Sequence, residues 1–147
     1  MMEVEIKKEI VEEILKLCRF DLIFSGDEDK IVSGSVEEVC GVLIGELKEN
    51  KIVVEKVRKA ENIAKSPFLF EISPHDLYNA YIDAQKEGKE VVGVFHSHPH
   101  GSPNPSPLDI KGIKGTGLLW LIVGRELKAF SYDNKLNKII ELKIKIE

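Results

Sequence analysis

The chain has 147 residues, of which 31% are charged, and a net charge of −4. This length suits a single domain with a substantial core, and the acidic balance offers no basic surface for nucleic acid. We expect a cytoplasmic protein with no membrane partner, because the apolar runs are too short to span a bilayer and the first residues lack the features of a signal peptide.

The N-terminal region, residues 1–19, is predicted to form an amphipathic helix from about Val4 to Arg19. Its apolar stripe would consist of residues at helical spacing, namely Ile6, Ile10, Ile14 and Leu17. Residues 20–35 follow as an irregular or hairpin-like stretch with a polar turn at Gly26–Asp29. The sequence indicates no role for this stretch.

Two strands, Val39–Leu47 and Lys51–Arg58, are predicted to form an antiparallel hairpin. The short apolar segment Pro67–Ile72 then leads into a helix over Pro74–Gly88, with Ser73 as its N-cap and Gly88 at its C-terminal end. The buried face of this helix is expected to contain Leu77, Tyr81 and Ala84.

The apolar run Val91–Phe95 is predicted to be a buried strand that ends at His96 and His98. Side chains two residues apart on a strand share a face, so the two imidazoles project together. Pro99 stops the strand, and Asp109 follows a loop that is short enough for the chain to fold back. Two imidazoles and one carboxylate form a ligand set for a catalytic zinc ion, with water in the fourth position.

Each part of this pattern also has a plain structural interpretation. A His-x-His pair at a strand end is more often a polar edge, and Ser106-Pro107-Leu108-Asp109 is a helix start with an N-cap and a first-turn acid. Ser73-Pro74-His75-Asp76 repeats that helix start without histidines before it. The site is therefore predicted from the conjunction of histidines and helix start.

A short helix from Pro107 and three further strands complete the α/β order. The strands are expected near Leu118–Val123, Lys128–Ser131 and Lys138–Ile146. The elements together predict a mixed β-sheet packed by helices.

Glu38, before an apolar strand that contains glycine, completes a motif that resembles that of the JAMM (MPN-plus) metalloprotease family. That motif is a Glu before such a strand, then His-x-His-Pro and Ser-x-x-Asp, with seven residues between the second His and the Ser. Seven residues also separate His98 from Ser106, and no motif position departs. The neighbouring Glu37 is the one ambiguity, and alignment on the following Val-x-Gly favours Glu38.

The resemblance covers roughly Glu38–Gly124 and implies that residues 1–147 form a single MPN/JAB domain with a fold similar to that of cytidine deaminases. In the family, the first helix runs almost directly into the strand after the Glu. Residues 20–35 are therefore interpreted as an insertion. The sequence leaves a homodimer open.

The resemblance also implies a role for each motif residue. His96, His98 and Asp109 would bind one zinc ion, Glu38 would be the general base, and Ser106 would donate a hydrogen bond to the oxyanion. Family members are isopeptidases that act on ubiquitin, ubiquitin-like modifiers or sulfur-carrier proteins. The expected substrate is therefore the bond after the C-terminal Gly-Gly of such a modifier, held extended along Ser66–Ile72, where Phe68 and Phe70 are either groove or core.

Three other classes of protein are alternatives. A catalytically silent MPN scaffold would lack the ligands that this chain has. A nucleobase deaminase would need His-x-Glu and Pro-Cys-x-x-Cys, and neither string is present. A non-haem iron oxygenase also uses two His and one carboxylate, but its spacing differs.

The remaining candidate residues receive structural interpretations. Ser97 would point to the opposite face of the strand from the histidines, His100 would be a solvated loop residue, and His75 has no partner pattern around it. Cys18 and Cys40 are expected to be buried thiols, and a disulfide between them is left open.

Overall fold

The structure is a computed structural model that describes residues 2–18, 20–25, 28–33, 37–67 and 69–147. Its helices are α1 (Lys8–Leu17), α2 (Pro74–Lys86) and α3 (Pro107–Thr116). Two strands form a separate hairpin, β2 (Phe20–Ser25) and β3 (Glu28–Ser33). The other strands are β1 (Glu3–Ile6), β4 (Cys40–Leu47), β5 (Lys51–Ala60), β6 (Glu90–Ser97), β7 (Leu119–Val123), β8 (Leu127–Asp133) and β9 (Lys138–Ile146).

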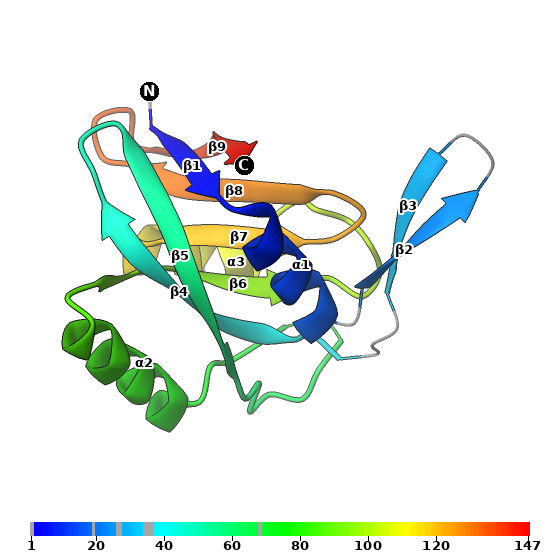
Figure 1. The fold of residues 1–147 in the computed structure, drawn as a ribbon, viewed down its shortest axis with the longest axis horizontal. Helices are drawn as coiled ribbons and strands as arrows, with labels where there is room; N and C mark the ends of the chain where they lie inside the picture. Colours follow the sequence, from blue (N-terminus) through cyan, green and yellow to red (C-terminus); the bar gives the residue numbers. More distant parts are fainter. Residues whose placement is uncertain (1, 19, 26–27, 34–36, 68) are drawn as a thin grey trace.

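One mixed sheet closes into a barrel in the order β1-β5-β4-β6-β7-β8-β9 (Figure 1). β1 runs parallel to both β5 and β9, and β6 runs parallel to β7, whereas the other neighbours are antiparallel. The predicted α/β fold with a mixed sheet and packing helices is confirmed.

The helices cover both faces of the sheet. Successive strand residues point to opposite faces, so neighbouring residues of one strand contact different helices. Leu43 of β4 packs in the core that contains Ile14 of α1, whereas its neighbour Val42 packs with Ala80 of α2. α3 packs on the same face of the sheet as α2. Its Ile113 belongs to a cluster with residues from β6, β7 and β8. The end of β6 is therefore enclosed by elements on both sides.

The N-terminal prediction is wrong in its first turn, because residues 3–6 form β1 and α1 begins only at Lys8. Val4 and Ile6 are buried between β5 and β9, to which β1 pairs on its two sides. Val4 and Ile6 are two residues apart, which is the period of a strand. The prediction instead counted Ile6 as part of the helical stripe that follows. Arg19 lies outside the described residues.

The hairpin-like interpretation is confirmed for residues 20–25 and 28–33 by the antiparallel pairing of β2 with β3, whereas residues 34 and 35 lie outside the described residues. The hairpin projects away from the barrel on the right of Figure 1. Of the predicted polar turn, Gly26 and Asp27 lie outside the described residues, and Glu28 and Asp29 belong to β3. Its interpretation as an insertion stays a prediction.

The other predicted elements are confirmed to within a few residues. The N-cap of α2 is Ser73, as predicted, and Gly88 lies just after the helix in a left-handed conformation, with φ of 69°. The predicted buried face is partly wrong: Ala84 is buried, but Tyr81 is 48% exposed. Ala80, which the prediction omitted, contacts the sheet in its place.

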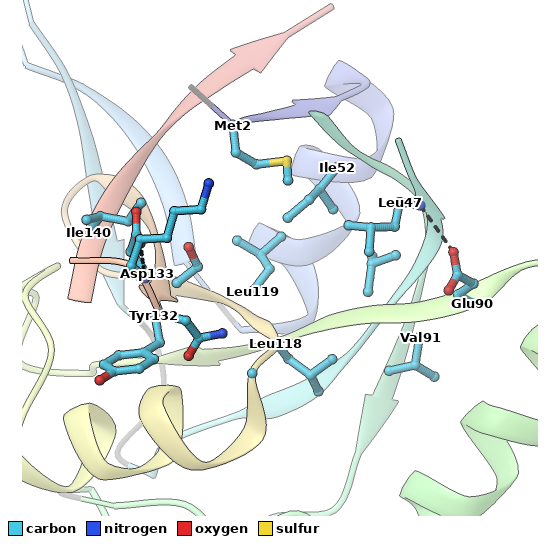
Figure 2. Close-up of a pocket in the computed structure, with 15 residues that line it drawn as sticks. Met2, Leu47, Ile52, Glu90, Val91, Leu118, Leu119, Tyr132, Asp133 and Ile140 are labelled. Atoms are coloured by element: carbon cyan, nitrogen blue, oxygen red, sulfur yellow. Dashed lines mark hydrogen bonds between the residues drawn. The ribbon is translucent and has the colours of Figure 1, made fainter. Parts of the chain in front are cut away.

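A cavity of about 540 Å³ lies where β6 and β7 begin (Figure 2). Its walls include Met2, Ile52, Val91 and Leu119. The histidines lie at the other end of β6, so this cavity is separate from the predicted site. Within the described part of the chain, no helix is long and apolar enough to cross a membrane.

Candidate metal centre

The position of β6 in the middle of the sheet places its histidines in the interior. His96 pairs with Cys40 of β4 on one side and with Ile122 of β7 on the other, and it is fully buried. His98 lies just beyond the strand, where its N–H donates to the carbonyl of Val123 at 2.9 Å. Backbone pairing therefore fixes both ligand candidates in place.

Glu38 reaches the same region because β4 is antiparallel to β6. The start of β4 lies beside the end of β6, and Val39 exchanges hydrogen bonds with Ser97: Ser97 N–H donates to the Val39 carbonyl, and Val39 N–H donates to Ser97 Oγ, both at 2.8 Å. Ser97 thus has the structural role predicted for it.

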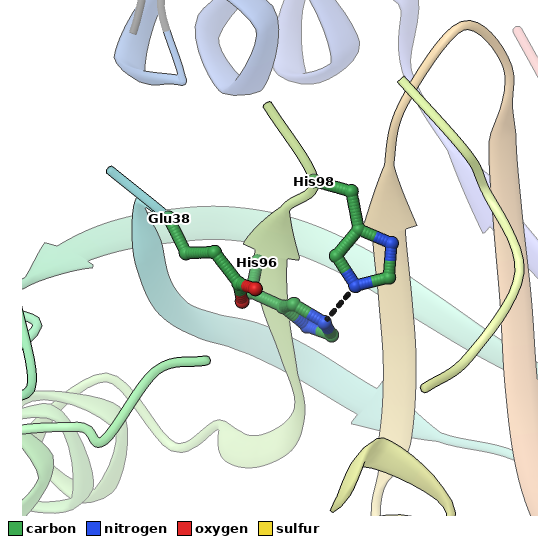
Figure 3. Close-up of side chains that lie close together, drawn as sticks. All are labelled: Glu38, His96 and His98. Atoms are coloured by element: carbon green, nitrogen blue, oxygen red, sulfur yellow. Dashed lines mark hydrogen bonds between the residues drawn. The ribbon is translucent and has the colours of Figure 1, made fainter. Parts of the chain in front are cut away.

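The Glu38 carboxylate points toward the imidazoles (Figure 3). Ligand atoms of Glu38, His96 and His98 lie within 4.8 Å of one another. The two imidazole Nε2 atoms are 3.2 Å apart. Three buried side chains therefore converge on one point: His96 from β6, His98 from just beyond β6, and Glu38 from the segment before β4.

Asp109 brings a second carboxylate to the imidazoles. Its Oδ1 lies 3.1 Å from His96 Nε2, and its Oδ2 lies 3.0 Å from His98 Nε2. A capping box at the start of α3 orients it: Ser106 N–H donates to Asp109 Oδ2 at 2.9 Å, and Asp109 N–H donates to Ser106 Oγ at 3.1 Å. Ser106 is thereby tied to the site, and its hydroxyl proton remains free to donate because the bond to Asp109 uses an oxygen lone pair.

The loop between His98 and α3 is closed by its own backbone. Gly101 N–H donates to the His98 carbonyl at 2.8 Å, and Gly101 adopts a φ of 95° that favours glycine. The Gly101 carbonyl accepts from Arg125 N–H at 2.6 Å. At the imidazole, His98 Nδ1 donates to the Ser102 carbonyl at 2.8 Å, which leaves Nε2 as the ligand atom.

The spacing of the donor atoms fits a tetrahedral metal ion. Zinc bonds of about 2.0–2.1 Å place two ligand atoms about 3.3 Å apart. The separations among His96 Nε2, His98 Nε2 and the oxygens of Asp109 are 3.0–3.2 Å. Glu38 Oε1 is buried and has no hydrogen-bond partner among the described residues. A metal ion would account for the spacing of the donor atoms, and water bound to it would provide a partner for Glu38 Oε1.

The ionisation of the four groups is set by burial and by their mutual contacts. Burial raises the pKa of Glu38 to about 8, although the charge of His98 opposes the shift. Burial lowers the pKa of His96. For Asp109 burial acts upward, but hydrogen bonds with His96 and His98 outweigh it and hold its pKa well below the usual range. The pKa of His98 is raised, because its bonds to Asp109 and to the Ser102 carbonyl outweigh the effect of burial.

Phe70, which the sequence left as groove or core, and Trp120, which the sequence did not assign to the site, both pack on the His96 ring. Phe70 stacks on it with centroids 4.3 Å apart, and Trp120 packs edge-on at 5.6 Å. Trp120 N–H donates to Thr116 Oγ1 at 2.9 Å. His96 Nδ1 is buried without a hydrogen-bond partner among the described residues, so aromatic packing takes the place of the usual acceptor. Phe68 lies outside the described residues.

The other candidate residues behave as simple structural residues. His100 is exposed and stacks on His98 with centroids 4.9 Å apart, and His75 is exposed on α2. Cys18 and Cys40 are free and buried, so the disulfide left open by the sequence is not formed. Burial raises the pKa of each thiol to about 12, which makes both poor nucleophiles.

Comparisons with known proteins agree with this geometry. Residues 30–135 match the family described as prokaryotic homologs of the JAB domain. The chain is 45% identical over 120 residues to a desampylase from Pyrococcus furiosus, which covers 80% of this chain and 82% of the relative. It is 26% identical over 128 residues to a desampylase from Haloferax volcanii, with 86% and 91% covered.

A solved structure has the same fold over nearly the whole chain. Protein DSY2949 from Desulfitobacterium hafniense superposes with a TM-score of 0.80 at 25% identity, over 99% of this chain and 93% of that one. The family match spans most of the chain and contains every motif residue. The chain therefore belongs to the family of prokaryotic JAB-domain homologues and is an isopeptidase of the JAMM metalloprotease type.

Proposed function

We propose that the protein is a zinc-dependent isopeptidase of the desampylase type, which cleaves the bond after the C-terminal Gly-Gly of a ubiquitin-like or sulfur-carrier modifier. The main support for this proposal is a set of four buried groups at the end of β6, namely Glu38, His96, His98 and Asp109. The names of the two desampylase relatives support the substrate class.

The motif assigns Asp109 as the third zinc ligand and Glu38 as the base, and the positions of both carboxylates are compatible with these roles. Asp109 lies 3.0–3.1 Å from both Nε2 atoms, as a ligand to the same ion would. Ligand atoms of Glu38, His96 and His98 lie within 4.8 Å of one another, so the Glu38 carboxylate is close enough to contact a water molecule held at this site. Zinc held by His96, His98 and Asp109 would supply a Lewis acid that lowers the pKa of water to about 7.

The chain's own residues would handle the proton and the oxyanion. The Glu38 carboxylate accepts a proton from the attacking water and gives it to the departing amine. The Ser106 hydroxyl donates a hydrogen bond to the carbonyl oxygen as that atom gains negative charge. The environment of Glu38 supports this role, because its buried Oε1 has no hydrogen-bond partner among the described residues that would compete for the proton.

The modifier tail would lie beside the segment that carries Phe70. A hollow of about 340 Å³ adjoins Asp109 and is lined by Leu69, Phe70, Leu108 and Trp120. An extended Gly-Gly tail would pair its backbone with the residues that line this hollow. A narrow hollow would select residues without side chains. The cytoplasmic location and the homodimer both stay predictions.

Fluorescent fusions of candidate modifiers provide the test. We expect cleavage after Gly-Gly that stops when a chelator removes the metal and returns with added zinc. Replacement of the penultimate glycine by a bulky residue should abolish cleavage. Cleavage that persists in the presence of the chelator would refute the zinc chemistry. Equal cleavage of the Gly-Gly tail and of the tail with the bulky residue would refute the proposed binding of the tail in a narrow groove. A silent scaffold would bind a conjugate without cleaving it.

A further inference from the structure

Asn62 connects two sides of the metal centre through its side-chain amide. Its Nδ2 donates to the carbonyl of Glu38 at 2.8 Å and to the carbonyl of Leu69 at 3.3 Å. Its Oδ1 accepts from the N–H of Ala64 at 3.1 Å and from the N–H of Glu71 at 2.9 Å. Two partners are donors and two are acceptors, so only this orientation of the amide satisfies all four.

The first of these bonds matters because Glu38 lies outside the sheet. β4 begins at Cys40, so no strand pairing fixes the backbone of Glu38. Instead, its N–H donates to the Ser66 carbonyl at 2.8 Å and its carbonyl accepts from Asn62. Because Oε1 has no hydrogen-bond partner among the described residues, this backbone contributes to holding the carboxylate in position.

The other bonds of Asn62 hold the backbone on both sides of Phe70. Leu69 provides the carbonyl before it, and Glu71 provides the N–H after it. The Phe70 ring in turn stacks on His96, whose Nδ1 has no hydrogen bond within the described structure to orient the imidazole. One amide therefore supports both the general-base candidate and the ring that packs on a ligand.

We propose that Asn62 is a positioning residue, which holds the Glu38 carboxylate and the Phe70 ring in place against the His96 imidazole. The proposal rests on the proposed function, in which Glu38 is the base and His96 a zinc ligand. The surrounding loop has further bonds that do not involve Asn62: Ile63 N–H donates to the Glu71 carbonyl and Ser73 N–H donates to the Glu61 carbonyl, both at 2.9 Å. Removal of the amide should therefore displace these groups without unfolding the loop.

The test uses Asn62→Ala, which removes all four bonds, and Asn62→Asp, which removes the two donors. The control is Asn79→Ala, because Asn79 makes its hydrogen bond within α2, to the exposed His75. We expect both Asn62 variants to fold and to lose about 10- to 100-fold in kcat, the cost of misplacing a reacting group by about 1 Å. Chelator competition without substrate measures the zinc dissociation constant. Relative to the control, this constant should rise severalfold in Asn62→Ala and should not rise in Asn62→Asp.

A double-mutant cycle with Glu38→Gln distinguishes positioning from a general structural effect. If Asn62 acts through Glu38, then Asn62→Ala should cost little further kcat once the carboxylate is gone. Additive losses, an unchanged kcat, or failure of both Asn62 variants to fold would overturn this proposal alone. Full activity of Glu38→Gln by itself would overturn the base assignment of the proposed function, and this proposal with it.

Discussion

Substitution of Gly112 by alanine tests whether packing around Trp120 supports the metal centre. Gly112 lies on α3 against the Trp120 indole, and a Cβ at this position would overlap the outer ring. The indole cannot easily turn aside, because its N–H bonds Thr116 and its edge packs on His96. The added methyl group must therefore move the ring or the helix.

A matched control isolates the cost of that overlap. Gly115 lies on the same helix, and a Cβ there would meet no heavy atom within 4 Å. Both substitutions gain up to about 1 kcal/mol of helix propensity, so they differ by the cost of overpacking, about 1–3 kcal/mol. For a chain of this length, each kcal/mol shifts the melting temperature by about 2–4 °C. We expect Gly112→Ala to melt about 2–12 °C below Gly115→Ala.

Thermal unfolding followed by circular dichroism checks the stability, and chelator competition checks the zinc affinity. Zinc binding should be weaker in Gly112→Ala than in Gly115→Ala, because a displaced Trp120 no longer supports the His96 ring. Equal melting temperatures and equal zinc affinities in the two variants would refute the argument that this contact is tight and supports the site.

Three further predictions concern the proposed chemistry and the thiols. The double variant His96→Ala with His98→Ala should fold but purify with little zinc by elemental analysis, and stoichiometric zinc would exclude these ligands. Glu38→Gln should keep its zinc while losing about 10²–10⁴-fold in turnover on a modifier fusion, and near-wild-type turnover would rule out Glu38 as the base. Cys18 and Cys40 should resist a thiol reagent in the native protein, because both are buried with pKa values near 12, and should react after denaturation. Rapid native labelling would contradict their burial.

The parts of the site that could be predicted are those fixed by short-range rules. His96 and His98 share a face because strand side chains alternate, and Ser106 begins a helix because its pattern is a capping box. The family motif supplied Glu38, which no local rule would have connected to the histidines. The antiparallel pairing of β4 with β6 is what brings it there.

The parts that could not be predicted depend on contacts distant in sequence or on the backbone. Asn62 and Phe70 lie in an irregular segment without periodicity, and their partners are backbone groups or a ring from β6. The acceptor for His98 is the Ser102 carbonyl, which carries no residue-type signal at all. β1 was missed for a related reason: a four-residue strand beside a helix shows too short an alternation to separate from the helical stripe.

The placement of β1 also sets the order in which the molecule can fold. β1 pairs with β9, the last strand of the chain, and the Glu147 N–H donates to the Ile6 carbonyl at 3.0 Å. Contacts between such distant segments must overcome the entropy of closing a long loop before they contribute any stability, which slows folding. During synthesis β1 can pair with β5, but closure of the barrel has to wait for β9. The seam between the first and last strands is therefore the last part of the barrel that can close during synthesis.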